Sequence, residues 1–308
     1  MSLSSVAAQI PLRPSEYFDL MVKPFGIIPN QWKWQPGETW LSTWNIVMAG
    51  TVGYLALVFG GRYLMDSSQS RPIKNRTIDS IHNAFLSLFS ALLLVLYIEE
   101  LYPVIKVHGF FPSLCHPDAW SPRIVYMHYL FYLSKWYEFL DTIFLVLKKK
   151  PLQFLHVYHH AMTMCLMFTQ IEGMNVVSWG PTVLNLAVHV VMYYYYFLAS
   201  RGKRVWWKKY ITIIQITQFV LDVAITHYFF YHIYIAPAFG LPYLDYCQGT
   251  TSAALFGCAL IWSYLVLFIQ FFNKTYKPQC NGGGGDAGRL EKKTSAGSSI
   301  SVGTEKSK

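Results

Sequence analysis

The chain has 308 residues, of which 53% are hydrophobic and 13% charged, and its formal net charge is +9. A soluble domain usually has about 25% charged residues, so this composition excludes an ordinary soluble enzyme and indicates a protein embedded in a membrane. Basic residues beside the spans explain the positive charge of such a protein, so the charge is no sign of a nucleic-acid partner. The first 35 residues are mixed in polarity and contain four prolines, so we expect no signal peptide and insertion through internal spans.

Seven stretches are apolar, and each is close to the roughly 20 residues that an α-helix needs to cross a bilayer. Prolines and glycines gather in the connections between them, where helix breakers are expected. Before the first stretch, Tyr17 to Val22 give a weaker signal for an interfacial helix. We therefore predict an all-α polytopic membrane protein with seven transmembrane helices, at residues 41–61, 79–98, 125–147, 155–171, 175–198, 210–235 and 249–273.

The positions of Lys and Arg predict the orientation of these helices. The first, third and fifth connections and the C-terminal tail hold nineteen of the 25 basic residues, and Lys135 lies within a span. Because basic residues concentrate on the cytosolic side, this alternation favours seven crossings with a cytosolic C-terminus. We expect an N-terminal lumenal segment at 1–39, a membrane domain at 40–275 and a disordered, Gly- and Ser-rich cytosolic tail at 276–308.

Polar and ionisable side chains recur inside four of the predicted helices at spacings of three and four residues. Residues at these spacings share one face of a helix, and ionisable groups at membrane depth are costly and usually functional. We therefore expect the polar faces to meet around an internal cavity. They are formed by Lys135, Glu138, Asp141 and Thr142; by His156, His159 and His160; by Asn185, His189, Met192 and Tyr196, with Tyr193 and Tyr195 beside them; and by Gln215, Gln218 and Asp222.

Each polar face also has a purely structural interpretation. Lys135 and Glu138 could form a buried ion pair, and Asn185 and the glutamines could join helices by hydrogen bonds. Isolated histidines such as His82 are expected to be structural. Three imidazoles on one face of a single span are harder to explain in this way, because each would need its own hydrogen-bond partner.

Two chemistries use clustered imidazoles within a membrane. A di-iron hydroxylase or desaturase needs more histidine ligands than one box and His189 supply, so we expect no metal. Acyl transfer uses imidazole as nucleophile or base, and the ordinary pKa of about 6.5 suits proton transfer near neutral pH. A seven-span receptor or transporter is the non-enzymatic alternative.

Two of the five cysteines, Cys115 and Cys247, fall in predicted connections on the same, non-cytosolic side. In an oxidising lumen they could form a disulfide, and two unrelated thiols are the alternative. The cysteine spacing indicates no zinc site.

The four polar faces are parts of longer motifs. Residues 135–142 read K-x-x-E-x-x-D-T, and residues 154–160 read F-L-H-x-Y-H-H. Residues 185–196 read N-x-x-x-H-x-x-M-Y-x-Y-Y, and residues 212–218 read T-x-x-Q-x-x-Q. In this order the motifs resemble those of the ELO family of very-long-chain fatty acid elongases, and with the flanking spans the resemblance extends over about residues 40–275.

The resemblance implies an endoplasmic-reticulum enzyme with seven helices, six of which surround a narrow acyl tunnel. It implies the condensing step of elongation, in which acyl-CoA and malonyl-CoA give 3-oxoacyl-CoA, carbon dioxide and CoA. It also implies no metal or redox cofactor, with the reductases and dehydratase of the cycle as separate proteins. A lumenal disulfide of the Cys115–Cys247 kind fits the family. Membrane lipid is an expected partner, and a homodimer stays an open expectation.

From the resemblance we expect His159 to attack the acyl thioester and to hold the acyl group as an acyl-imidazole, assisted by His160, His156 and His189. Direct condensation without a covalent intermediate is the competing mechanism. Supporting roles in the cavity are expected for Lys135, Glu138, Asp141, Asn185, Tyr193, Tyr196 and Gln215.

Two departures from the family bear on substrate and location. Pro151 stands where some members, often those that act on polyunsaturated chains, have Gln, and Lys148 to Leu152 look more like fungal members that act on saturated or monounsaturated chains. A polyunsaturated-chain elongase is the alternative. The C-terminal residues contain only one lysine of a dilysine retrieval signal, so the endoplasmic-reticulum location follows from the family.

Overall fold

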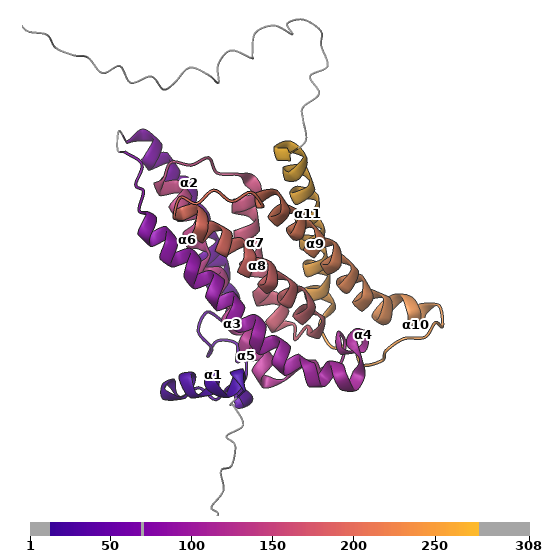
Figure 1. Cartoon of the computed structure of the whole chain (residues 1–308). Coiled ribbons are helices and arrows are strands. Elements are labelled where there is room, and N and C mark those ends of the chain that lie inside the picture. Colours follow the sequence, from indigo (N-terminus) through magenta and orange to yellow (C-terminus); the bar gives the residue numbers. More distant parts are fainter. Residues whose placement is uncertain (1–12, 69–70, 277–308) are drawn as a thin grey trace, which may run out of the picture.

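The computed structural model describes residues 13–68 and 71–276, and every regular element in this part of the chain is helical (Figure 1). Each of the seven predicted apolar stretches lies in a helix or a pair of helices. The longer helices are α2 (Trp44–Ser67), α3 (Arg76–His108), α5 (Pro122–Tyr137), α7 (Phe154–Glu172), α8 (Trp179–Ser200), α9 (Lys208–Phe230) and α11 (Thr251–Tyr276), and the shorter ones are α1 (Pro14–Val22), α4 (Phe110–Ser113), α6 (Phe139–Leu147) and α10 (Ala236–Ala238).

Local sequence signals begin two of these helices. The side chain of Asn75 accepts hydrogen bonds from the Thr77 and Ile78 N–H groups in the first turn of α3, and Ser121 caps α5, with proline at the first helical position. The predicted helix at 125–147 divides at Glu138, where the Asp141 N–H bonds to the Glu138 carbonyl and tightens the turn. Between α9 and α10 the chain forms a π-helix, Tyr231–Ile235.

Five helical segments within the described residues are long and apolar enough to cross a membrane: Trp44–Ser67, Arg76–His108, Val176–Ser200, Lys208–Ala238 and Thr251–Tyr276. The two predicted spans outside this set carry the most polar motifs. Because the third is broken at Glu138, α5 and α6 are each too short. The fourth, α7, has 19 residues but carries the three box histidines, which lower its hydropathy. The structure thus supports a multi-pass membrane protein but not the count of seven.

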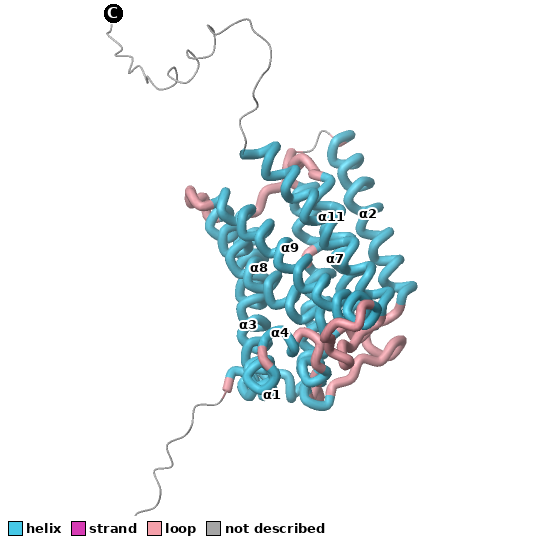
Figure 2. The backbone as a smooth tube through the Cα atoms, turned by 90° about the vertical axis from the view of Figure 1, so that its right-hand side faces the viewer, coloured by secondary structure: helices cyan, strands magenta, loops and turns pink. Residues whose placement is uncertain are grey.

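Six helices pack as a closed ring, in which α3 contacts α8, α8 contacts α9, α9 contacts α11, α11 contacts α7, α7 contacts α5, and α5 contacts α3. Helix α2 lies outside the ring against α6 and α7. Figure 2 shows the long helices upright and side by side, with α1 and α4 at the lower end. The interior of the ring is where the polar faces of α5 to α9 meet.

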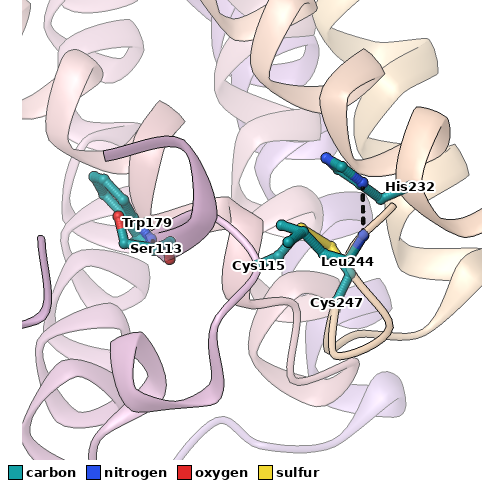
Figure 3. The surroundings of a disulfide bond; sticks show 6 residues. All are labelled: Ser113, Cys115, Trp179, His232, Leu244 and Cys247. Atoms are coloured by element: carbon teal, nitrogen blue, oxygen red, sulfur yellow. Dashed lines mark hydrogen bonds between the residues drawn. A yellow bond between two sulfur atoms is a disulfide. The ribbon is translucent and has the colours of Figure 1, made fainter. Parts of the chain in front are cut away.

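A disulfide closes the lower end of the bundle (Figure 3). Cys115, which follows α4, is bonded to Cys247 in the connection before α11, the pair expected from the sequence. Nearby, His232 accepts a hydrogen bond of 3.0 Å from the Leu244 N–H. The bond therefore ties the α3–α5 connection to the α10–α11 connection.

The N-terminal segment is anchored to the same end. Helix α1 contains the short helix expected at 17–22. Its Ser15 hydroxyl donates to Glu99 of α3 at 2.6 Å, and Asp19 pairs with Arg123 of α5 at 2.7 Å. The C-terminal tail expected to be disordered lies outside the described residues, apart from Tyr276.

Candidate active site

A cavity of about 470 Å³ occupies the ring interior. Its wall includes Lys148 after α6, Lys208 at the start of α9 and Tyr276 at the end of α11, and we call this the upper end of the bundle. The structure brings ten of the eleven residues proposed as catalytic or supporting to this wall: Glu138, Asp141, His156, His159, His160, Asn185, His189, Tyr193, Tyr196 and Gln215.

A second, narrower cavity of about 70 Å³ adjoins the first. We call the larger one the upper cavity and the narrower one the inner cavity. They share four wall residues, His159, Asn185, Gln218 and Phe219. Of the four histidines proposed from the sequence, only His159 borders both cavities.

His159 has no hydrogen-bond partner among the described residues. Its ring instead lies against aromatic rings, with centroid distances of 4.8 Å to Tyr264 and 6.2 Å to Phe268. The imidazole is therefore held by packing, and neither nitrogen is committed to a protein group. Such a side chain can bond to a molecule in the cavity.

His156 is held by a chain of hydrogen bonds that begins outside the ring. Tyr54 of α2 lies with its hydroxyl 2.8 Å from Thr142 Oγ1, which is 3.0 Å from His156 Nε2. Tyr54 Oη has no other partner in the described part of the chain, so we assign its proton to Thr142 Oγ1 and the Thr142 proton to His156 Nε2. A neutral His156 then carries its own proton on Nδ1 and is a hydrogen-bond donor.

Asp141 joins three other side chains at the cavity wall. Its Oδ1 accepts a 2.7 Å hydrogen bond from His82 Nε2, and its Oδ2 accepts one of 2.7 Å from the Tyr193 hydroxyl. His160 Nε2 lies 4.0 Å from the same Oδ2. His82, which the sequence suggested to be merely structural, thus lines the cavity. Because it is 59 residues from Asp141, no spacing rule could have linked the two.

Lys135, the eleventh residue, lies behind the wall in a buried ion pair. Its Nζ donates to Glu138 Oε1 at 2.8 Å, and the two side chains are 1% and 2% exposed. The ammonium also lies 3.4 Å from Asn185 Oδ1. His189 Nδ1 is 3.7 Å from the same Glu138 oxygen, an arrangement that turns the other ring nitrogen away from Glu138.

Asn185 and Gln215, for which supporting roles are expected, form hydrogen bonds with groups other than the histidines. Asn185 accepts from Lys135, and Gln215 Nε2 donates to Met192 Sδ at 3.4 Å. Within residues 13–68 and 71–276, neither amide bonds directly to an imidazole. Of the box histidines, His156 is positioned by Thr142, His160 lies 4.0 Å from Asp141, and His159 is held by ring packing.

The one group of three side chains in the described residues with metal-ligand spacing is His108, His116 and Asp118, at the lower end. The histidine box does not form such a group. The polar groups on the wall of the upper cavity include imidazoles, hydroxyls and carboxylates, which are suited to proton transfer and to binding an acyl or enolate oxygen.

These features define a class: a multi-pass helical membrane protein whose ring of helices surrounds a histidine-lined cavity. The ELO family model, described as the GNS1/SUR4 family, matches residues 39–282. The chain therefore belongs to the ELO family of fatty acid elongases.

Individual members of the family are similar over most of this chain. "Putative fatty acid elongase 1" of Schizosaccharomyces pombe is 43% identical over 258 residues, which are 83% of this chain and 77% of the relative. "Fatty acid elongase A" of Dictyostelium discoideum is 38% identical, over 82% of this chain and 91% of the relative. "Long chain fatty acid elongase 2" of Caenorhabditis elegans is 33% identical, over 81% and 90%. The comparisons thus support a role in fatty acid elongation.

Proposed function

We propose that the protein is the condensing enzyme of this elongation, an acyltransferase that converts acyl-CoA and malonyl-CoA into 3-oxoacyl-CoA, carbon dioxide and CoA. The observation that carries the proposal is the place of His159, the one of the four histidines that borders both cavities. Its ring nitrogens have no hydrogen-bond partner in the described part of the chain, so they are free to react. A histidine at this junction can hold an acyl chain in the inner cavity while its reactive carbon faces the upper one.

In the first half-reaction, a nitrogen lone pair of His159 attacks the thioester carbonyl carbon. The carbon–sulfur bond breaks, CoA leaves with a proton, and an acyl-imidazole remains. The oxyanion formed during this step needs a donor. With the hydrogen-bond directions assigned above, His156 has an Nδ1–H group whose ring is held by Thr142 and Tyr54. We propose this group as the donor to the oxyanion.

In the second half-reaction, malonyl-CoA loses carbon dioxide, and its enolate carbon attacks the acyl carbon. The bond to His159 breaks and the 3-oxoacyl-CoA is released. His189, whose Nδ1 faces Glu138, would stabilise or position this second substrate together with His160. The Asp141 carboxylate would hold Tyr193 and His82 in place around them.

The CoA groups would enter from the upper end of the cavity. Lys208 on the wall there is a cation suited to a phosphate, whereas Lys148 already pairs with Asp79 at 2.6 Å. We propose that this end faces the cytosol, that α5–α6 and α7 complete seven crossings, and that the protein resides in the endoplasmic reticulum with its N-terminus lumenal. The six-helix ring would then be the wall of the acyl tunnel.

The substrates we propose are saturated or monounsaturated long chains, on the grounds of Pro151 and its neighbours. Polyunsaturated chains are the alternative. No metal or redox cofactor enters the proposal, and separate reductases and a dehydratase would complete the cycle. The membrane domain at 40–275 and a homodimer stay predictions. The proposed reaction depends on neither of them.

One assay tests the proposal. Microsomes that contain the protein are incubated with labelled malonyl-CoA and a panel of saturated and unsaturated acyl-CoAs. We expect chains lengthened by two carbons and release of carbon dioxide in equal amount. Absence of carbon dioxide release would favour a receptor or transporter, and stoichiometric iron in the purified protein would favour a di-iron enzyme. Intact-protein mass spectrometry with acyl-CoA alone separates the two mechanisms, because direct condensation leaves no adduct.

A further inference from the structure

The inner cavity follows the helices downward from His159. Its wall continues along α7 from His159 to Gln170 and along α9 from Gln218 through Asp222 to Thr226 and Phe229. With a rise of about 1.5 Å per residue, eleven residues of either helix span about 16 Å. A long acyl chain attached at the junction therefore lies along this wall.

Asp222 is one of two residues on this wall that carry a buried oxygen without a hydrogen-bond partner. Its side chain is 2% exposed, Gln218 Nε2 donates to Oδ2 at 3.0 Å, and Oδ1 has no hydrogen-bond partner. The neighbouring hydroxyls differ, because Thr226 donates to its own helix backbone and Thr163 bonds to Tyr264. Asn175 Oδ1 is the other unpaired buried oxygen on this wall, and it lies lower, against Gly249.

Asp222 lies so near the mouth of the inner cavity that even a short acyl chain reaches it. Asp222 lies one helical turn beyond Gln218, which borders both cavities, and so it stands near the mouth of the inner cavity. That turn is about 6 Å deep, and an extended chain, which advances about 1.2 Å per bond, covers it in about five bonds. Any chain that fills the inner cavity therefore runs past Asp222.

Water cannot be the partner while the chain is in place. In the absence of an acyl chain, the inner cavity has room for water. A chain that enters must take the same space, and an unsubstituted chain then leaves a buried carboxyl oxygen unsatisfied, which is unfavourable. A hydroxyl on the chain removes this penalty, because an alcohol donates to a carboxylate and accepts from a carboxylic acid.

We propose that the inner cavity is built for an acyl chain that carries a hydroxyl group in its carboxyl-proximal half, and that Asp222 Oδ1 is its hydrogen-bond partner. This inference rests on the proposed function. It makes Asp222 a substrate-binding residue that selects hydroxyacyl-CoA over the unsubstituted acyl-CoA of the same length.

The test compares kcat/KM of the full-length protein for unsubstituted acyl-CoA and for a set of hydroxyacyl-CoAs of equal length, with the hydroxyl moved carbon by carbon through the first half of the chain. For the best isomer we expect a preference of about tenfold over the unsubstituted chain. The preference should depend strongly on which carbon carries the hydroxyl, because a single fixed oxygen binds that hydroxyl. A wild-type protein that elongates the unsubstituted chain at least as well as every isomer overturns the inference.

Variants show whether Asp222 causes the preference. Asp222→Leu should lose it and gain activity on the unsubstituted chain, because the unpaired oxygen is gone. Asp222→Asn, which has nearly the same shape and can still pair with an alcohol, should keep part of it. Thr226→Val, one turn farther on the same wall, removes a hydroxyl that already has a partner and should leave the ratio unchanged. If Asp222→Leu changes both activities equally, the inference is wrong.

The outcomes separate this inference from the proposed function. A protein that elongates unsubstituted chains without preferring a hydroxyl retains the function and loses the inference. A protein that elongates neither class loses both. Gel filtration in detergent checks that each variant is folded, and Asp222→Asn decides the question if Asp222→Leu does not fold.

Discussion

The hydroxyl of Tyr54, on α2, lies 2.8 Å from Thr142 Oγ1, on α6, and through it a helix outside the ring reaches the histidine box. The ring of Tyr54 stacks on Phe139 with centroids 4.2 Å apart, so the phenol is held in one orientation. Fixing an imidazole in this way preserves its tautomer, and with it the direction of the hydrogen bonds that it can offer.

Tyr54→Phe should therefore impair catalysis without unfolding the protein. The substituted ring keeps the stack on Phe139 but frees Thr142 to rotate, and His156 then loses its fixed tautomer. We expect kcat to fall about 5- to 10-fold, the effect of one hydrogen bond, with KM nearly unchanged. Tyr63→Phe, on an exposed part of the same helix, is the matched control. An equal loss of kcat in both variants would show that the hydrogen bonds from Tyr54 through Thr142 to His156 do not matter for catalysis.

His159→Ala should abolish elongation and also the covalent acyl adduct, because no other histidine borders the inner cavity. The protein should remain folded, since His159 makes only ring contacts. Mass spectrometry of the intact protein after incubation with acyl-CoA measures the adduct, and His227→Ala, at an exposed position, is the control. An adduct that survives in His159→Ala would move the nucleophile to another residue.

Lys135→Met should destabilise the protein, because it leaves the Glu138 carboxylate buried and unpaired. Loss of one partner of a buried ion pair costs about 3–5 kcal/mol. Adding Glu138→Leu should restore much of the thermal stability, because two apolar side chains need no partners. It should not restore activity, since Glu138 lies 3.7 Å from His189. Thermal unfolding in detergent measures the stability, and the elongation assay measures the activity. A Lys135→Met variant as stable as the wild type would contradict the expected loss of stability.

Removing the disulfide should loosen the lower end of the bundle. The bond closes a loop of 132 residues, and loss of such a cross-link costs about 2–5 kcal/mol. Cys115→Ser, Cys247→Ser and the double variant should lower Tm by similar amounts, because each removes the same bond. Cys258→Ser changes a free thiol and serves as the comparison. Additive losses in the double variant would show that the two sulfurs act separately.

The sequence predicts helices and cavity residues well where the signal is local. Spacings of three and four residues predicted that His156, His159 and His160 share a face, and long apolar runs predicted the positions of the helices. The end of α3 was missed because a proline usually ends a helix, whereas α3 continues past Pro103 to His108.

Contacts between distant helices account for what the sequence did not reveal. Tyr54 and His82 belong to the site only because α2 packs beside α6 and α3 borders the ring interior. The sequence around an isolated Tyr or His in an apolar helix does not indicate which residue it will contact. Asp222 was recognised as part of a polar face, but its unpaired oxygen depends on which neighbours surround it. The break at Glu138 likewise follows from a local turn that periodicity does not encode.

The order of helices around the ring has a consequence for how the protein is made. Helix α7, which carries the histidines, lies between α5 and α11, and α11 is the last of the described helices to leave the ribosome. Until α11 is in place, one side of α7 has no helix beside it. The nascent chain must therefore keep three imidazoles away from lipid without α11. The cavity can therefore close only once α11 is made, and we expect a chain cut short before α11 to be degraded instead of forming a smaller functional protein.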